Sequence, residues 1–237
     1  MKTQTLTLFA IDNGIRAAAA AGIIVSLLLA GFFLAEPRIS HGQSDTASFY
    51  VRQTITDETS FLVDPGNVTM NGSISGITGG NATGSSRFVV KSNNASGYYV
   101  DISFFDNAGA YAMRGDEDGG AQIRDYGPGG AAQPQYNFTA STAAQFAYTL
   151  NSSTTLDTSD SFLNNGSNTC NTGATQTFGK CWKSPTVTAF RVVDRTTAAT
   201  TGATSTLYFK VSVPSSANPT PTAQTYTATA TLSVFTQ

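Results

Sequence analysis

Hydrophobic and polar residues alternate along several stretches of the chain beyond residue 43. One of them runs from Tyr98 to Phe104, where every second side chain is apolar. Successive side chains of a strand point to opposite faces of a sheet, so a period of two predicts strands with one buried face. Shorter stretches share the pattern: 49–55, 61–63, 88–90, 146–150, 190–192, 207–213 and 226–234.

Turn-forming residues separate these stretches. Residues 93–97, Asn-Asn-Ala-Ser-Gly, lie between two of them and predict a hairpin. Many short strands with turns between them predict an all-β fold. We expect a two-sheet antiparallel β-sandwich of the immunoglobulin-like or pilin-like kind, with a closed barrel as the alternative.

Two long stretches do not alternate. Residues 106–144 are rich in Gly, Ala and Asp, and residues 151–186 are rich in Ser, Thr and Asn. They are interpreted as loop elaborations of the sandwich. Long loops on a rigid scaffold often carry function, so recognition of a partner is expected there first.

The N-terminal part of the chain carries an export pattern. A run of apolar or small residues at 17–35 follows the basic residues Lys2 and Arg16. Ser40 and Gly42 then provide small residues at the −3 and −1 positions of a signal-peptidase site. The pattern predicts cleavage between Gly42 and Gln43.

The same apolar run is also long enough for a membrane helix, so residues 1–42 are either a cleaved signal peptide or a retained membrane anchor. Under both interpretations, positive charge keeps the short N-terminal flank inside, and residues 43–237 form a single exported domain. We therefore expect a protein that leaves by the general secretory route and is extracellular or at the cell surface. It would touch a membrane only through an uncleaved helix.

Composition supports this picture and narrows the possible partners. Beyond residue 42, Thr supplies 32 of 195 residues and Glu only two, which favours strands over helices. The same part contains ten Lys and Arg against thirteen Asp and Glu, a net charge of −3. The basic residues are scattered singly, which argues against a nucleic-acid partner.

His41 is the only histidine, and it precedes the expected cleavage site. The exported part therefore has no imidazole for general acid–base catalysis or for a catalytic triad. A pair of carboxylates could still hydrolyse a glycosidic bond, but Glu58 and Glu117 are the only glutamates there, and no working pair stands out. We expect no catalytic activity.

Cys170 and Cys181 are the only cysteines. A lone pair in an exported chain predicts a disulfide. Two free thiols and a metal site are the alternatives, and the missing histidines disfavour the second.

The densest acidic cluster is residues 114–120, Arg-Gly-Asp-Glu-Asp-Gly-Gly. Asp116 and Asp118 are spaced as in part of a calcium loop, and Ca²⁺ prefers oxygen ligands. Calcium is thus the one cofactor that the sequence suggests. A solvated turn is the alternative.

Three motifs support a resemblance. They are residues 64–70 (Asp-Pro-Gly-Asn-Val-Thr-Met), residues 92–100 (Ser-Asn-Asn-Ala-Ser-Gly-Tyr-Tyr-Val), and Val213-Pro214 followed by residues 225–232 (Thr-Tyr-Thr-Ala-Thr-Ala-Thr-Leu). With them the chain resembles uncharacterised exported β-sandwich surface proteins, immunoglobulin-like in type, of ultrasmall candidate-phyla bacteria. The resemblance implies a secreted or surface setting and no particular activity.

These features lead to two expectations about function. The first is a structural or adhesive surface protein that assembles with itself or binds other surface proteins or glycans, for example by adding an edge strand such as 49–55 to a neighbour's sheet. The alternative is a carbohydrate-binding module, assisted by calcium, in which an exposed aromatic residue such as Tyr99 stacks on a sugar.

Overall fold

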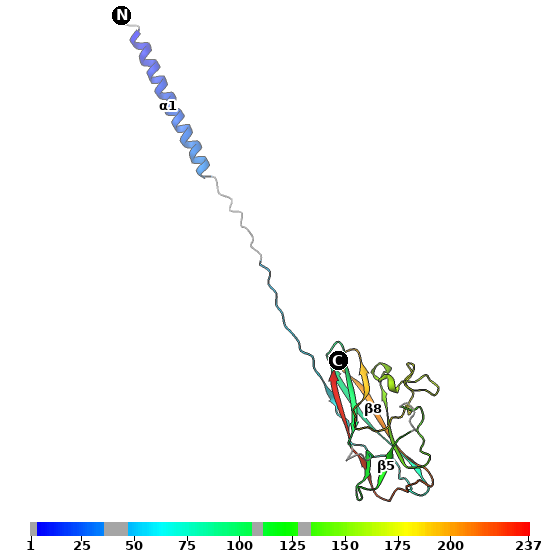
Figure 1. Ribbon diagram of the computed structural model, residues 1–237. Coiled ribbons are helices and arrows are strands. Elements are labelled where there is room, and N and C mark those ends of the chain that lie inside the picture. Colours follow the sequence, from blue (N-terminus) through cyan, green and yellow to red (C-terminus); the bar gives the residue numbers. More distant parts are fainter. Residues whose placement is uncertain (1–3, 36–46, 106–110, 128–133) are drawn as a thin grey trace. The chain divides into compact units, whose positions relative to one another are not determined.

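The computed structural model describes residues 4–35, 47–105, 111–127 and 134–237. The chain divides into two compact units, Met1–Gln53 and Thr54–Gln237, each described by itself below. Every named strand lies in the second unit (Figure 1). This unit also contains the hydrophobic core and the disulfide, so it has what a domain needs to fold alone.

The first unit contains helix α1, Gln4–Ala35. Five consecutive alanines and three consecutive leucines favour a helix, and the first proline follows the helix at position 37. In the part of the chain that the structure describes, no helix combines the length and the apolar character that crossing a bilayer requires. The predicted cleavage site between Gly42 and Gln43 lies outside the described residues.

The larger sheet of the second unit has seven strands and curls into a half barrel. In spatial order they are β1 (Thr59–Val63), β2 (Gly80–Ser92), β8 (Ala199–Val213), β6 (Gln145–Ser152), β5 (Gln122–Asp125), β4 (Met113–Gly115) and β9 (Tyr226–Ala228). Neighbouring strands are antiparallel except β5 and β6, which are parallel.

The smaller sheet has three antiparallel strands, in the order β10 (Ala230–Thr236), β3 (Tyr98–Phe104) and β7 (Phe190–Arg195). Two short 3₁₀ helices, η1 (Thr155–Asp157) and η2 (Asp160–Phe162), lie beside β7. The Ser159 amide donates a hydrogen bond to the Val192 carbonyl, so β7 is paired on its outer side as well.

The expectation of a β-rich fold with one N-terminal helix is confirmed, but the two sheets do not form a clean immunoglobulin-like sandwich, because the larger one is mixed and curled. Residues 106–144, which were interpreted as a loop, contribute β4 and β5 to the larger sheet. The chain from Tyr126 to Ala144 then returns to start β6 parallel to β5. A parallel pair needs a long crossover of this kind, which an antiparallel hairpin series does not contain.

The predicted hairpin at residues 93–97 is also wrong. Strands β2 and β3 belong to different sheets, so the turn between them carries the chain from one sheet to the other. Gly97 has φ +92°, and a Cβ there would lie 1.8 Å from the Arg195 carbonyl oxygen. The close approach of the β7 backbone therefore requires glycine at the crossing.

The C-terminal stretch makes a second crossing. Its first part, β9, pairs with β4 in the larger sheet, and its second part, β10, pairs with β3 in the smaller one. Thr229 stands between the two parts. One alternating stretch of sequence thus supplies a strand to each sheet.

The main hydrophobic core lies on the inner faces of the two sheets. The stripe predicted on β3 is confirmed, because Val100 and Ile102 are fully buried and Phe104 nearly so. Phe104 packs against Phe146 and Tyr148 of β6, with ring centroids 6.0 and 5.2 Å apart.

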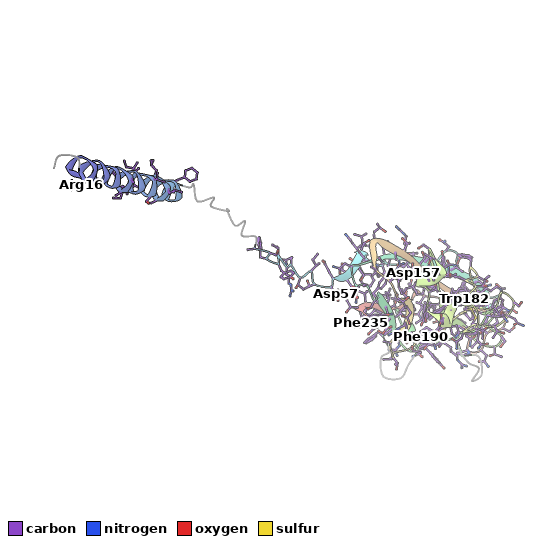
Figure 2. All side chains as sticks on the ribbon, turned by 90° about the horizontal axis from the view of Figure 1, so that it is seen from above. Arg16, Asp57, Asp157, Trp182, Phe190 and Phe235 are labelled. Carbon is purple, nitrogen blue, oxygen red and sulfur yellow. A yellow bond between two sulfur atoms is a disulfide. The ribbon has the colours of Figure 1, made fainter. Side chains whose placement is uncertain are left out.

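A second cluster covers the outer face of the larger sheet. Tyr126 and Phe138 come from the crossover, and Trp182 comes from the segment before β7; they pack with Ala147 of β6. Strand β6 is therefore buried on both faces, and every residue from Phe146 to Leu150 is buried. Thr149, the polar residue of this stretch, donates its hydroxyl to the Lys180 carbonyl. Figure 2 labels Trp182 among the packed side chains of this unit.

The disulfide predicted between Cys170 and Cys181 is present. Cys181 is fully buried in the core, and Cys170 is nearly so. The bond closes a loop within residues 151–186. No named strand lies between Ser152 and Phe190, so the disulfide holds the shape of this loop where no sheet does.

Candidate functional site

The first candidate site is the segment from residue 47 to 58, called the exposed segment below. It was predicted to contain a strand at 49–55, and this is wrong: residues 47–58 have no strand assignment, and all of them are exposed. The apolar side chains of Phe49, Val51 and Ile55 are 83%, 86% and 82% exposed. An alternating apolar face is thus present without a strand beside it.

The exposed segment ends at an anchor to the turn after β2. The side-chain oxygen of Asn93 accepts a hydrogen bond from the Glu58 amide, and its Nδ2 donates to the Thr56 carbonyl. The Asn93 amide donates in turn to the Glu58 carbonyl. These bonds fix the residues just before β1 (Asp57 is labelled in Figure 2).

The second candidate site is a cleft of about 1250 Å³ on the inner side of the larger sheet. Its floor is formed by core residues of β6 and β8, among them Phe146, Leu207 and Val211. Two connections cover it, residues 65–77 after β1 and residues 220–225 before β9. This volume exceeds the roughly 300–1,000 Å³ that is usual for small-molecule sites.

Close packing holds the covering connections in place. A Cβ at Gly76 would lie 2.6 Å from the Pro221 carbonyl oxygen, so the two connections touch there. A Cβ at Gly84 of β2 would lie 2.4 Å from the Val68 side chain. The Asn71 amide also donates a hydrogen bond to the Thr83 carbonyl. The cleft is therefore bounded by fixed chain on both sides.

A smaller cavity of about 340 Å³ lies between Phe104, Lys183 and residues 185–190. The Lys183 ammonium lies 4.5 Å over the Phe190 ring. Partial burial lowers the pKa of Lys183 from its ordinary value of 10.5. The backbone of Lys183 exchanges two hydrogen bonds with that of Tyr148 in β6. The residue is therefore paired with the larger sheet and also lines the cavity.

The acidic residues singled out as calcium ligands lie in the turn between β4 and β5. An oxygen of Asp116 accepts a hydrogen bond from the Thr227 hydroxyl, and one of Asp118 accepts from the Gly120 amide. Among the residues described, no group of three or more acidic, histidine or cysteine side chains is placed to hold a metal ion. Calcium at Asp116 and Asp118 stays a prediction.

The aromatic residue proposed to stack on sugars already has neighbours within the fold. Phe235 of β10 stacks on Tyr99 with centroids 5.0 Å apart, and the Arg191 guanidinium carbon lies 3.8 Å from the centre of the Tyr99 ring. These contacts tie β10, β3 and β7 together on one face of the smaller sheet.

Sequence reasoning placed recognition in the loops at 106–144 and 151–186, and it missed the cleft. The cleft is lined by stretches at 65–77 and 220–228 that look like ordinary turns. Their one available signal is composition, since both lack charged residues and carry Thr and Pro.

Comparison of the chain with protein-family models, curated proteins and solved structures finds no match.

Proposed function

We propose that this chain is an exported, non-catalytic surface protein that assembles with further copies of itself through the exposed segment. The observation that carries the proposal is the high exposure of three apolar side chains, Phe49, Val51 and Ile55, in a segment that belongs to no strand. Large apolar side chains in a row on soluble proteins often mark an interaction surface.

The energetics favour burial of this face against a partner. Fully burying a Val, Ile or Phe side chain contributes about 1.5–3 kcal/mol, so three contribute roughly 4.5–9 kcal/mol before the cost of ordering the segment. In a strand, Phe49, Val51 and Ile55 would share one face, with Gln53 between the last two. This placement suits strand addition, in which backbone hydrogen bonds hold the peptide and alternate side chains enter the partner.

The partner's sheets provide the complementary backbone. They end in the edge strands β1, β9, β10 and β7, of which β7 already takes a bond from Ser159. An unpaired edge offers a row of N–H and C=O groups to an incoming strand. A second copy of the chain therefore has the groups that the exposed segment needs.

Assembly is tested on residues 43–237, which include the compact β unit and the whole exposed segment. We expect the mass from light scattering to rise with concentration, and negative-stain images to show oligomers. The triple variant Phe49→Ser, Val51→Ser, Ile55→Ser removes the apolar face and should stay monomeric.

A matched control removes three exposed apolar side chains elsewhere, Leu156→Ser, Phe178→Ser and Val187→Ser, which are 80%, 66% and 59% exposed in the parent. It should assemble like the parent. A parent that stays monomeric at every concentration contradicts the proposal, and so does a control that also loses assembly.

The surface location needs its own measurement. Antibodies against the β unit, coupled to gold particles, should label intact cells, and external protease should remove the label. Gold confined to the cytoplasm would rule out an exported protein, whatever the assembly experiment shows.

A further inference from the structure

The cleft under the half barrel has a chemical character of its own. Its lining of 33 residues contains no Asp, Glu, Lys, Arg or His. Charged residues make up 12% of the chain, so a lining of this size would ordinarily contain some of them. A lining without charged residues disfavours charged ligands. A charge buried there would lose its water without gaining a partner.

The floor and the covering connections differ in polarity. The floor is buried and apolar, with Phe146, Leu207 and Val211 as examples. The connections contribute exposed hydroxyl side chains, among them Ser73, Ser75 and Thr225. The cleft therefore combines a deep apolar region with an outer region that offers neutral hydrogen-bonding groups.

The larger polar side chains at the cleft are already engaged. The Tyr226 hydroxyl donates to the Thr222 carbonyl at 3.0 Å. The Gln224 side-chain oxygen accepts from the amides of Glu117 and Asp118, at 3.1 and 3.0 Å. These bonds stiffen the covering connection. Other hydroxyls of the lining also bond within the fold, those of Ser75, Ser86, Thr220, Thr222 and Thr227. Ser73 and Thr225 are the exposed hydroxyls best placed to meet a ligand.

Several apolar residues at the cleft are only half-buried although they pack against the core. They include Met70, Ile74, Phe209 and Leu232. Their remaining exposed surface faces a space of about 1250 Å³, so an apolar ligand there would complete the burial of four large side chains.

From these features we propose that the cleft binds a neutral amphiphile, a molecule with an apolar chain or ring system and an uncharged hydroxyl-bearing head. The chain lies on the floor formed by β6 and β8, and the head meets the Ser and Thr hydroxyls of residues 65–77 and 220–225. Lipids with a carboxylate or phosphate head are excluded, because the lining offers no cation to pair with them.

The test uses residues 54–237, which form one compact unit and omit Phe49 and Val51. The first probe is N-phenyl-1-naphthylamine, which is uncharged and fluoresces in apolar surroundings. The second is 1-anilinonaphthalene-8-sulfonate, which has nearly the same ring system and one negative charge. We expect saturable binding of the neutral probe and about tenfold weaker binding of the sulfonate, since an unpaired charge is costly to bury.

Competition then identifies the head group. 1-Decanoylglycerol and decanoate have the same acyl chain, and both are added below the concentrations at which they self-associate. The glycerol ester should displace the neutral probe, whereas decanoate should displace it about tenfold less effectively.

Two variants place the binding in the cleft. Ala228→Trp fills it from β9 and should weaken binding of the neutral probe about tenfold, while Ala198→Trp, at a half-buried alanine outside the cleft, should leave it unchanged. Leu232→Lys adds a cation to the wall and should reverse the preference, so that decanoate competes better than the ester. Far-ultraviolet circular dichroism checks that each variant is folded.

The proposal is overturned if the parent prefers the sulfonate or binds both probes equally. It is also overturned if folded Ala228→Trp binds the neutral probe as the parent does, or if Leu232→Lys leaves the order of the competitors unchanged. None of these results depends on self-assembly.

Discussion

The exposed segment and strand β3 have the same sequence pattern and opposite fates. Both place apolar residues two positions apart, as in Phe49 and Val51 and in Val100 and Ile102. In β3 the apolar face is fully buried, whereas in the exposed segment Val51 is 86% exposed. The pattern therefore gives a segment the capacity to form a strand, and something else decides whether it does.

That further requirement is a partner on each side. Strand β3 pairs with β10 along its whole length and with β7 along most of it, and its inner face meets the rings of β6. The end of the exposed segment is held instead by Asn93, which bonds to the backbone of Thr56 and Glu58. No strand is assigned within residues 47–58, and the apolar side of this segment lies in water, which is the basis of the assembly proposal.

The sharpest way to break this comparison is one substitution made in both places. Ile102→Ala removes a fully buried side chain and should lower the free energy of unfolding by about 4 kcal/mol. Ile55→Ala removes a side chain that is 82% exposed and should leave the unfolding midpoint of the monomer unchanged. Urea denaturation measures both, and equal losses would show that the exposed segment packs on its own domain.

The next largest effect concerns the outer edge of the smaller sheet. Arg195 at the end of β7 pairs with Asp157 of η1, whose side chain is fully buried (Figure 2 labels Asp157), and donates to the carbonyls of Thr197 and Ala198. Arg195→Met should cost about 3 kcal/mol, because it leaves a buried carboxylate without its cation.

The control for this change is Arg191→Met on the same strand. Its side chain is 42% exposed and pairs with Asp101 and Asp194, whose side chains are 20% and 38% exposed, so its loss should cost less than about 1 kcal/mol. Thermal unfolding compares the two variants. A larger cost at Arg191 would contradict the view that the sheet edge depends on the buried pair.

The stretch from residue 153 to 186 contains no named strand and does not alternate, so we expect its shape to depend on the Cys170–Cys181 disulfide. Replacing Cys170 and Cys181 with serine opens a loop with a sequence separation of 11 and should cost roughly 2–3 kcal/mol through chain entropy. Unfolding of the parent with and without reductant is an independent measure. Reductant should lower the free energy of unfolding of the parent by the same amount as the serine substitutions lower it without reductant.

The smallest expected effect follows pH. Because burial lowers the pKa of Lys183 in the folded state, the unfolded chain binds more protons between that lowered pKa and the ordinary 10.5, and stability should rise with pH across this interval. Below it, the lysine is charged in both states, and the cost of burying the charge is at its largest.

Lys183→Met should therefore be more stable than the parent at pH 7, with the difference shrinking as the pH approaches 10.5. Lys91→Met replaces an exposed lysine of β2 and serves as the control. Urea midpoints at pH 7 and pH 10 give the comparison. A difference that grows with pH would have the wrong sign for this explanation.

The sequence was sufficient to predict the longer strands, but not the short strands β4 and β5, and it predicted a strand at 49–55 that is absent. It was insufficient to predict how the strands are arranged. Alternation located β3, β6, β7 and β8, because the side-chain period is a local property of the chain. The sheet to which a strand belongs depends on distant partners. The turn at 93–97 and the break at Thr229 carry the chain between sheets, and neither differs in composition from an ordinary turn or strand.

The candidate sites divide in the same way. The disulfide was predictable, since the chain has two cysteines and they have one possible pairing. The cleft was not predictable, because its walls come from many strands and two connections. Some of the residues that line it, such as Ile74 and Leu232, are more than 100 positions apart in the sequence. Only the absence of charge in those connections was visible beforehand.

The turn after β2 also brings the two ends of the β unit together. Asn93 binds the backbone of Thr56 and Glu58, while the side-chain amide of the next residue, Asn94, donates to the carbonyl of Gln237 at 2.7 Å. Domains whose ends meet tolerate circular permutation. A short glycine-rich bridge from Gln237 to Glu58, with new chain ends opened at Gly119, should give a permuted chain with the same sheets. The exposed segment could then be attached at either of the new ends.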